Sequence, residues 1–379
     1  MTDWAASMGE ESLLSDARSL WERARLATRG RSVEVYVKHA RRWGLRRDPD
    51  RASLHEHEVL EVGTACRWTI DGERAVAHVA MVGTDLGRLQ HVIESASAVP
   101  RTDPASLATE ADPPEQREDR EPAGARFDPV EVRQWMSEAT SISSVELGLT
   151  TEILVGPGGW RTLRTRARSS ALIGRLPQLV ARRGFDVTHL PVAVDERAEL
   201  VGSSPTLHLA PPAAAPLVMA LVHAAHSSRP WVGEETGKGW DVQDQPASPE
   251  GLAGGAFDDA GFPTEARALA AGGRVIAGLD GPGTYWRRSY RDAPLPLPST
   301  IVVGAADIRP APARVIHACR VLPLDRENWM LELPGEPSRY VRTGPAELLR
   351  SVRGVFGSPD PTPDGVVTPG LVLERIVLR

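Results

Sequence analysis

The sequence predicts an α+β fold with two domains: an N-terminal mixed sheet with helices, and a β-rich C-terminal domain of mainly antiparallel strands. Three observations predict it. The chain has 379 residues, which is long for one domain and about right for two. In the first half, long segments alternate apolar and polar residues between segments with helical spacing. In the second half, short β segments are separated by turns rich in Gly and Pro.

The N-terminal domain is predicted to open with a helix followed by three strands. The apolar residues of Glu11–Thr28 approximate helical spacing. Val33, Val35 and Val37 alternate with polar neighbours, which predicts a strand. Residues 57–83 indicate two more strands around Asp-Gly, which is a strong hairpin cue between alternating segments.

Two further helices are predicted on either side of a linker. Asp85–Ala98 is the first, with Asp85 as its N-cap. Residues 100–126 are rich in Pro and acids and poor in large apolar residues, so we expect a flexible linker or surface loop there. Asp128–Ala139 is the second helix, with Pro129 at its first position.

The remaining elements define a boundary near residue 203. Residues 144–156 and 160–176 predict two strands, and the composition then shifts to Pro and Ala. We therefore predict domains over 1–202 and 203–379. The second domain is expected to open with a helix over Leu217–Ser227. Five short strands and a helix near residue 345 follow in RVIAGLDG, STIVVGAADI, ARVIHACRVLPL, NWMLELPG, PAELLRSVRGV and LVLERIVL.

Composition narrows the class of protein. With 44 Lys plus Arg and 50 Asp plus Glu, the formal charge of −6 argues against sequence-independent nucleic-acid binding. The two cysteines, Cys66 and Cys319, make no disulfide framework, which fits a reducing compartment. The apolar run Ala213–Ala225 is shorter than the roughly 20 residues that span a bilayer. No signal peptide is evident, so we expect a cytoplasmic protein without membrane contact.

One stretch, MALVHAAHSSRP, resembles half of a zinc site. His223 and His226 lie three apart, which places both imidazoles on one helical face. Hydrolytic zinc needs about three protein ligands, an open position for water and a base. No Glu follows His223, so Glu234 or Glu235 would have to act as the base. Three interpretations stay open: a working site, a dismantled one, or an ordinary helix end.

Other polar residues have a structural and a chemical interpretation. Cys319, two residues after a histidine on one strand, is favoured as a core or cavity-lining residue over a ligand or nucleophile. A second pair, His55 and His57, is favoured as an exposed strand face. Residues 234–240 are Gly-rich but lack the spacing of a phosphate-binding P-loop, so we expect a mobile loop there.

The block Asp258-Asp259-Ala260-Gly261-Phe262-Pro263-Thr264 allows two roles of equal weight. Asp can bond the backbone ahead of it, Gly permits a positive φ and Pro fixes the exit, so the block can be a turn without chemistry. Alternatively, Asp258, Asp259 and Thr264 line a substrate-binding cavity together with the histidine pair.

This block, within residues 254–279, resembles the Asp-Asp-Glu-Gly-x-Pro-Thr stretch of the TldD/TldE (PmbA) family, with Ala260 at the acidic third position. The helix that carries MALVHAAHSS stands where that family has its metal-binding helix. Residues 338–360 resemble the C-terminal pattern of the family, and residues 369–379 resemble its last strand. The resemblance covers most of the chain, with motif identity limited to about a dozen residues.

The resemblance implies a heterodimer of a zinc peptidase-like TldD subunit and a TldE subunit without the zinc motif. The zinc subunits carry His-Glu-x-x-x-His and a late Cys. This chain lacks that Glu, has its second histidine at His226 in place of two residues later, and has no Cys after Cys319. It is therefore most similar to the TldE/PmbA-like subunit, with no cofactor of its own and zinc expected in the partner.

The implied function is to shape a cavity and bind an extended peptide or small amide that the zinc subunit hydrolyses, in peptide processing or natural-product maturation. One alternative is a self-contained metal-dependent hydrolase that uses His223 and His226. Another is a binding or scaffolding protein that keeps the fold without a catalytic partner.

Overall fold

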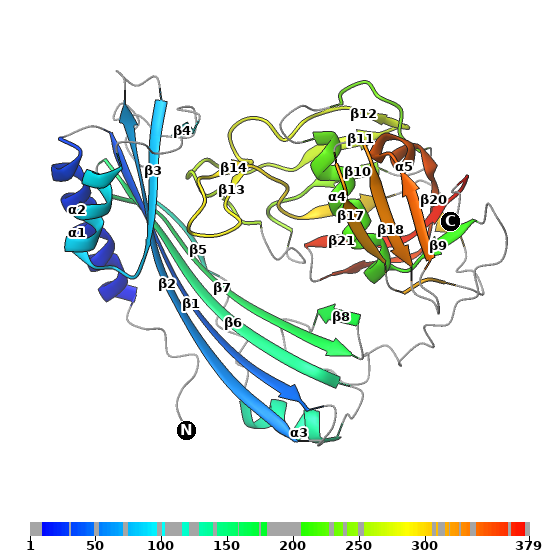
Figure 1. The fold of residues 1–379 in the computed structure, drawn as a ribbon, viewed down its shortest axis with the longest axis horizontal. Coiled ribbons are helices and arrows are strands. Elements are labelled where there is room, and N and C mark those ends of the chain that lie inside the picture. Colours follow the sequence, from blue (N-terminus) through cyan, green and yellow to red (C-terminus); the bar gives the residue numbers. More distant parts are fainter. Residues whose placement is uncertain are drawn as a thin grey trace.

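The computed structural model contains two large sheets, each with its own helices (Figure 1). In the part of the chain that the structure describes, no helix is long and apolar enough to cross a membrane. The described residues are 10–29, 32–48, 53–70, 75–96, 101–102, 116–120, 129–138, 142–157, 159–173, 176–179, 206–226, 231–237, 241–248, 254–304, 308–309, 315–317, 319–325, 327–333, 339–362 and 365–375.

Within the described residues the first sheet is mixed and has eight strands, in the order β4-β3-β2-β1-β6-β7-β5, with β8 also paired to β7. All its neighbours are antiparallel except β5 and β7, which are parallel. Its strands are β1 (Val33–Arg47), β2 (Leu54–Ile70), β3 (Ala75–Val82), β4 (Arg101–Thr102), β5 (Arg117–Arg120), β6 (Ile142–Gly156), β7 (Gly159–Ile173) and β8 (Leu176–Leu179).

Three helices in the described part of the chain accompany this sheet. Helices α1 (Glu10–Ala27) and α2 (Leu86–Ser95) pack together on one face, and Val33, Val35 and Val37 of β1 belong to the core beneath them. Helix α3 (Pro129–Glu138) contacts the far end of β1 and β2 (Figure 1). We call the opposite face, which carries Tyr36 and Arg164, the inner face. Figure 1 shows the C-terminal half of the chain on that side.

The second sheet also has eight strands, in the order β12-β11-β10-β15-β21-β20-β16, with β9 paired to β21. It is mainly antiparallel, and β15–β21 and β16–β20 are parallel. These strands are β9 (Leu207–Leu209), β10 (Asp241–Asp244), β11 (Arg267–Ala271), β12 (Arg274–Val275), β15 (Ile301–Gly304), β16 (Ile308–Arg309), β20 (Val352–Pro361) and β21 (Val366–Leu373).

Helix α4 (Pro211–His226) packs on β21 and forms the second core with it. Helix α5 (Pro345–Ser351) lies beside β20. The described residues of this half also form two smaller sheets. They contain β13 (Tyr285–Trp286), β14 (Leu295–Pro296), β17 (Arg320–Pro323), β18 (Trp329–Leu333) and β19 (Arg339–Thr343).

The predicted α+β class is confirmed, and so is the order of N-terminal elements. The N-cap of α2 is confirmed because Asp85 Oδ1 accepts the Arg88 N–H at 2.6 Å. Helix α4 begins at Pro211, earlier than the predicted Leu217: Pro211 and Pro212 lie in its first turn, where prolines are tolerated, and Pro216 lies inside the helix. The Asp71-Gly72 turn and the predicted boundary near residue 203 lie outside the described residues.

The predicted linker over residues 100–126 is wrong at two places. Arg101–Thr102 forms β4 on the edge of β3, and Arg117–Arg120 forms β5 parallel to β7. These two segments are ordered by main-chain pairing, although their composition is charged. The carboxylate of Asp119 also takes part in a hydrogen bond with the C-terminal half. The rest of that segment lies outside the described residues.

A buried carboxylate joins β10 to the segment that enters β15. Asp244 is 1% exposed and accepts hydrogen bonds from the Ser299 backbone N–H at 3.1 Å and from the Ser299 hydroxyl at 2.5 Å. Burial raises the pKa of Asp244 to about 6, although these hydrogen bonds lower it.

We expect Asp244 to make stability depend on pH. A carboxyl group whose pKa is raised by folding stabilises the fold fully below its unfolded pKa of about 3.9, and that stability is lost as the pH rises through about 6. The wild-type chain should therefore gain about 2–3 kcal/mol relative to Asp244→Asn between pH 7 and pH 4. Urea unfolding at each pH measures this gain, with the exposed Glu11→Gln as the control. A constant difference between wild type and Asp244→Asn would contradict the expectation.

Candidate functional site

The two histidines of the predicted zinc half-site lie in the last turn of α4. His226 is 3% exposed, and its Nδ1 donates to the Ala277 carbonyl at 2.5 Å. His223 is half-buried. Burial lowers the pKa of both side chains, and nearby Arg288 lowers the pKa of His223 further. The negative end of a helix dipole favours a cation. Desolvation outweighs it here and keeps both rings neutral at pH 7.

The described contacts of the two candidate bases, Glu234 and Glu235, are with other residues and not with these two histidine rings. Glu234 is exposed, and its Oε2 is 3.9 Å from Nη2 of the exposed Arg350. The backbone of Glu235 forms a bridge with Arg274. Among the described residues, no three His, Cys, Asp or Glu side chains gather as a metal-binding group. The donors present around α4 therefore do not fit a catalytic zinc ion, and we derive no step through one in this chain.

The other singled-out polar residues follow their structural interpretations. Cys319 packs against the second core, and burial raises the pKa of its thiol to about 12, so it is no ready nucleophile. His55 and His57 lie on an exposed stretch of β2, as predicted. The ring of His57 lies over Gly44, where an added Cβ would be 2.2 Å from His57 Cε1.

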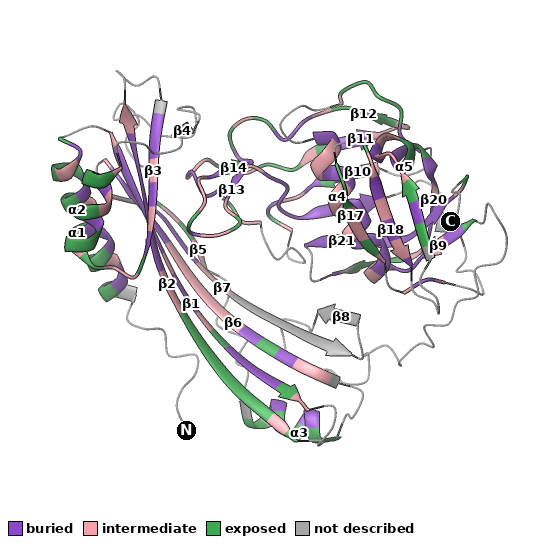
Figure 2. Cartoon of the chain, in the orientation of Figure 1, coloured by how far each residue is buried: buried purple, intermediate pink, exposed green. Residues whose placement is uncertain are grey.

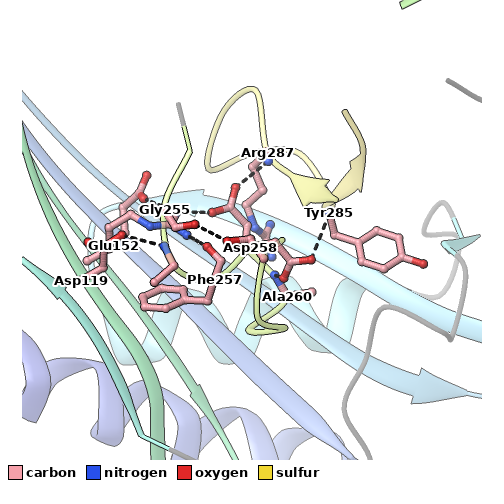
Figure 3. Close-up of polar contacts among 12 residues, drawn as sticks. Asp119, Glu152, Gly255, Phe257, Asp258, Ala260, Tyr285 and Arg287 are labelled. Atoms are coloured by element: carbon pink, nitrogen blue, oxygen red, sulfur yellow. Dashed lines mark hydrogen bonds and ion pairs between the residues drawn. The ribbon is translucent and has the colours of Figure 1, made fainter. Parts of the chain in front are cut away.

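Asp258 organises the turn that the Asp-Asp block predicts. Its side chain is 0% exposed. Oδ1 accepts the backbone N–H groups of Ala260 and Phe262, each at 3.0 Å. Oδ2 accepts those of Gly283 at 2.9 Å and Tyr285 at 3.1 Å (Figure 3). One carboxylate thus holds the turn itself and ties it to a second segment. Burial raises the pKa of Asp258 to about 6.

Asp259 connects this turn to the first sheet. Its Oδ1 accepts a hydrogen bond from Arg164 Nη1 of β7 at 2.6 Å, and its Oδ2 accepts the Arg287 backbone N–H at 2.6 Å. Arg164 also bonds the Phe257 carbonyl and lies 3.2 Å from Glu152 Oε2. Burial alone would lower the pKa of Arg164, but Asp259 and Glu152 raise it above its ordinary value. This guanidinium therefore stays charged.

The beginning and the end of the turn are closed by two more contacts. Asp119 of β5 accepts the Ala256 backbone N–H at 3.2 Å, and Thr264 donates its hydroxyl hydrogen to the Gly255 carbonyl. A Cβ on Gly255 would lie 2.5 Å from Asp119 Oδ2 and 2.8 Å from Arg166 Nη2. Gly255 lets the backbone pass close to the charged side chains of the sheet, and a Cβ there would make the ends of those side chains shift.

A buried polar network continues across the inner face beneath this loop (Figure 3). Arg287 lies over the Tyr36 ring, 4.5 Å from its centroid. Burial and the neighbouring Glu152 raise the pKa of Tyr36 well above its ordinary value. Burial would raise the pKa of Glu152, but the cations Arg164, Arg166 and Lys38 lower it to about 2. The carboxylate is therefore ionised and the phenol neutral.

The structure thus gathers Asp258, Asp259 and Thr264 in one loop and places His223 and His226 on another element. The side chains of Asp258 and Asp259 are used in holding the loop, which supports the structural interpretation. Their role in substrate binding stays a prediction. Sequence reasoning missed Arg164, Glu152 and Tyr36. The sequence of β7 carries no local signal for them, because alternating charged residues such as Arg164 and Arg166 are equally typical of a strand face exposed to solvent.

Sequence comparison alone does not assign this chain to a family. No family model matches it, and no curated protein matches it.

Comparison of structures defines the class of fold. TldE from Thermococcus kodakarensis is similar over 97% of this chain and 99% of its own, with a TM-score of 0.62 and 13% identity. A proposed modulator of a DNA gyrase from Thermotoga maritima is similar over 96% of this chain and 100% of its own, with a TM-score of 0.64 and 12% identity. A proposed modulator of DNA gyrase from Bacteroides thetaiotaomicron is similar over 97% of this chain and 99% of its own, with a TM-score of 0.63 and 13% identity.

The chain therefore has the TldE fold along essentially its whole length. The fold that the resemblance implied is confirmed. The likeness reaches both sheets, so neither half is an addition to the fold.

Proposed function

We propose that this chain is the non-catalytic, TldE-like subunit of a two-chain zinc metallopeptidase. It shapes a cavity and binds an extended peptide or small amide, in peptide processing or natural-product maturation. The TldD-like partner would hold the zinc ion, and the chemistry that such an ion would supply there is the activation of water toward an amide carbonyl. The observation that carries the proposal is the TldE fold combined with an α4 whose two histidines have no third ligand among the described residues.

The surroundings of the candidate base Glu234 support the same role. A hydrolytic metal site needs a nearby carboxylate as base, and the described contacts of Glu234 run to Arg350. The inner-face network supports it as well. Arg164 and Asp258 hold the loop in one position on the sheet, so the chain offers a rigid wall that needs no rearrangement to receive a substrate.

One observation favours the alternative of a self-contained hydrolase. The Ala277 carbonyl fixes the proton of His226 on Nδ1, which leaves Nε2 as the lone-pair nitrogen. Metal-binding histidines commonly have this second hydrogen bond. In this alternative, His223 and His226 bind the metal and a base comes from Glu234 or Glu235.

Metal content and peptide hydrolysis distinguish the two functions. We expect the chain alone to bind no stoichiometric zinc and to cleave nothing, and the chain co-expressed with its genomic neighbour to co-purify with a zinc subunit and to cleave peptides. His223→Ala/His226→Ala should then keep the zinc content of the complex within about twofold of wild type. Stoichiometric zinc and activity in the isolated chain, abolished by that double variant without unfolding, would establish the alternative instead. Recovery of no partner would favour a scaffolding protein.

A further inference from the structure

One half of β2 is an edge strand within the described part of the first sheet. The pairing of β2 with β1 runs from Leu54 to Trp68, but its pairing with β3 covers only Gly63 to Ile70. Residues 54–62 therefore have a neighbouring strand on one side. We call this segment the β2 edge. Figure 2 shows most of it as exposed.

The β2 edge carries exposed apolar side chains. Val59 is 46% exposed and Leu60 is 56% exposed. Natural edge strands are commonly protected from pairing by charged side chains. Here the acids are tied back to arginines of β1 and α3: Glu58 to Arg41, Glu61 to Arg42 at 3.0 Å, and Glu56 to Arg133. These ion pairs offset part of the negative charge, so the repulsion that the acids present to an approaching strand is reduced but not removed.

Hydrogen bonds at the middle and near the end of β2 show which backbone groups face away from β1. The Val62 carbonyl accepts a hydrogen bond from the Gly83 N–H at 2.9 Å, on the side of β2 away from β1. The Thr69 N–H donates to the Ser32 carbonyl at 3.1 Å, on the side of β1. Because backbone groups alternate along an antiparallel strand, even-numbered residues point away from β1. The N–H and C=O groups of Glu58 and Leu60 are therefore directed to the open side.

We propose that the β2 edge pairs antiparallel with the β2 edge of a second copy of this chain, about a two-fold axis at Val59. A two-fold axis perpendicular to the sheet preserves its faces, so residues an equal number of positions before and after the axis stand opposite each other. In this register Val59 meets Val59 and His57 meets Glu61. Glu58 and Leu60 exchange backbone hydrogen bonds across the axis.

The register centred on Val59 is the complementary one. A register centred on Glu58 would place two carboxylates opposite each other, which is unfavourable. A register centred on Leu60 would separate His57 from Glu61 and set Val59 against Glu61. At Val59 the pair is of the non-hydrogen-bonded type, in which the side chains approach most closely, so the two valines cover each other. Charge and packing thus agree on one self-complementary arrangement.

This inference is independent of the proposed peptidase role. It joins the two first sheets into one continuous sheet, with both inner faces on the same side. The contact is isologous and closes on itself, so it produces a dimer and no larger assembly.

Sedimentation velocity of the full chain over a hundredfold range of concentration tests the dimer. We expect a dimer in the wild type and an increase of its Kd by about tenfold or more in Val59→Lys, which sets two lysines against each other at the axis. The matched control is Leu324→Lys, at a leucine 55% exposed in the C-terminal half, which should leave the Kd unchanged.

A second variant tests the backbone contact. Leu60→Pro removes an N–H that points away from β1, so it should keep the fold and weaken the dimer at least as much. Circular dichroism checks the fold of both variants. A wild-type monomer at every concentration, or a Val59→Lys dimer as tight as the wild type, would overturn the proposal. Occupation of the edge by a peptide or by the zinc subunit in a monomeric chain would overturn it equally.

Discussion

Arg164→Met lowers the free energy of unfolding by about 3–5 kcal/mol, because it leaves two buried carboxylates without their cation. Asp259 and Glu152 both lie within 3.2 Å of Arg164 Nη1. The guanidinium also lies 4.8 Å from the Phe257 ring and 5.2 Å from the Trp286 ring. Methionine keeps much of the volume and none of these interactions. Equilibrium unfolding in urea, followed by circular dichroism, measures the loss.

A surface arginine supplies the control. Arg320 is 73% exposed and lies 3.8 Å from Glu332, so Arg320→Met should change stability by less than about 0.5 kcal/mol. Arg164→Lys should fall between the two, because an ammonium keeps the charge but cannot match the planar fork of the guanidinium. Equal losses for Arg164→Met and Arg320→Met would refute the assigned role of Arg164.

Asp258→Ala should cost about 3–5 kcal/mol, since it removes the acceptor of four backbone N–H groups in a buried turn. The loss extends beyond the turn because two of these donors, Gly283 and Tyr285, belong to another segment. Amide hydrogen exchange at Gly283 and Tyr285 should therefore accelerate together with the drop in unfolding free energy.

Two further variants separate the acceptor role from packing. Asp258→Asn keeps one acceptor oxygen of similar shape, so it should lose less than Asp258→Ala. Asp280→Ala, at an exposed residue nearby, should be close to neutral. If Asp258→Ala unfolds with the same free energy as wild type, the turn does not depend on this carboxylate.

Local patterns predicted most of the N-terminal elements. Alternation identified β1, and capping chemistry placed α2 one residue after Asp85. The turn at Asp258 was also predictable, because its bond to the Ala260 N–H is local along the chain. In the C-terminal half, strands such as β12 and β16 have two residues each, which is too short for periodicity to define their ends.

The inner face could not be predicted from alternation. Alternation predicted β1 as a strand but not the surroundings of its polar positions, of which Glu34 is 1% exposed and ion-paired with Arg67 and Arg161. Whether the polar face of a strand is solvated depends on what the rest of the chain places over it. Here the loop that contains Asp259 arrives from 95 positions farther along than Arg164, and no local pattern encodes that distance.

The position of β21 has a consequence for synthesis on the ribosome. This strand is buried at every residue, pairs with β9, β15 and β20, and follows every other described strand in the chain. The first sheet can therefore form while translation continues, but the second must wait for its central strand to emerge. At about 5–20 residues per second, the nascent C-terminal half exposes its apolar surfaces for many seconds. A premature stop just before Val366 would leave a finished first sheet attached to a half without its centre, a substrate for chaperones and proteases.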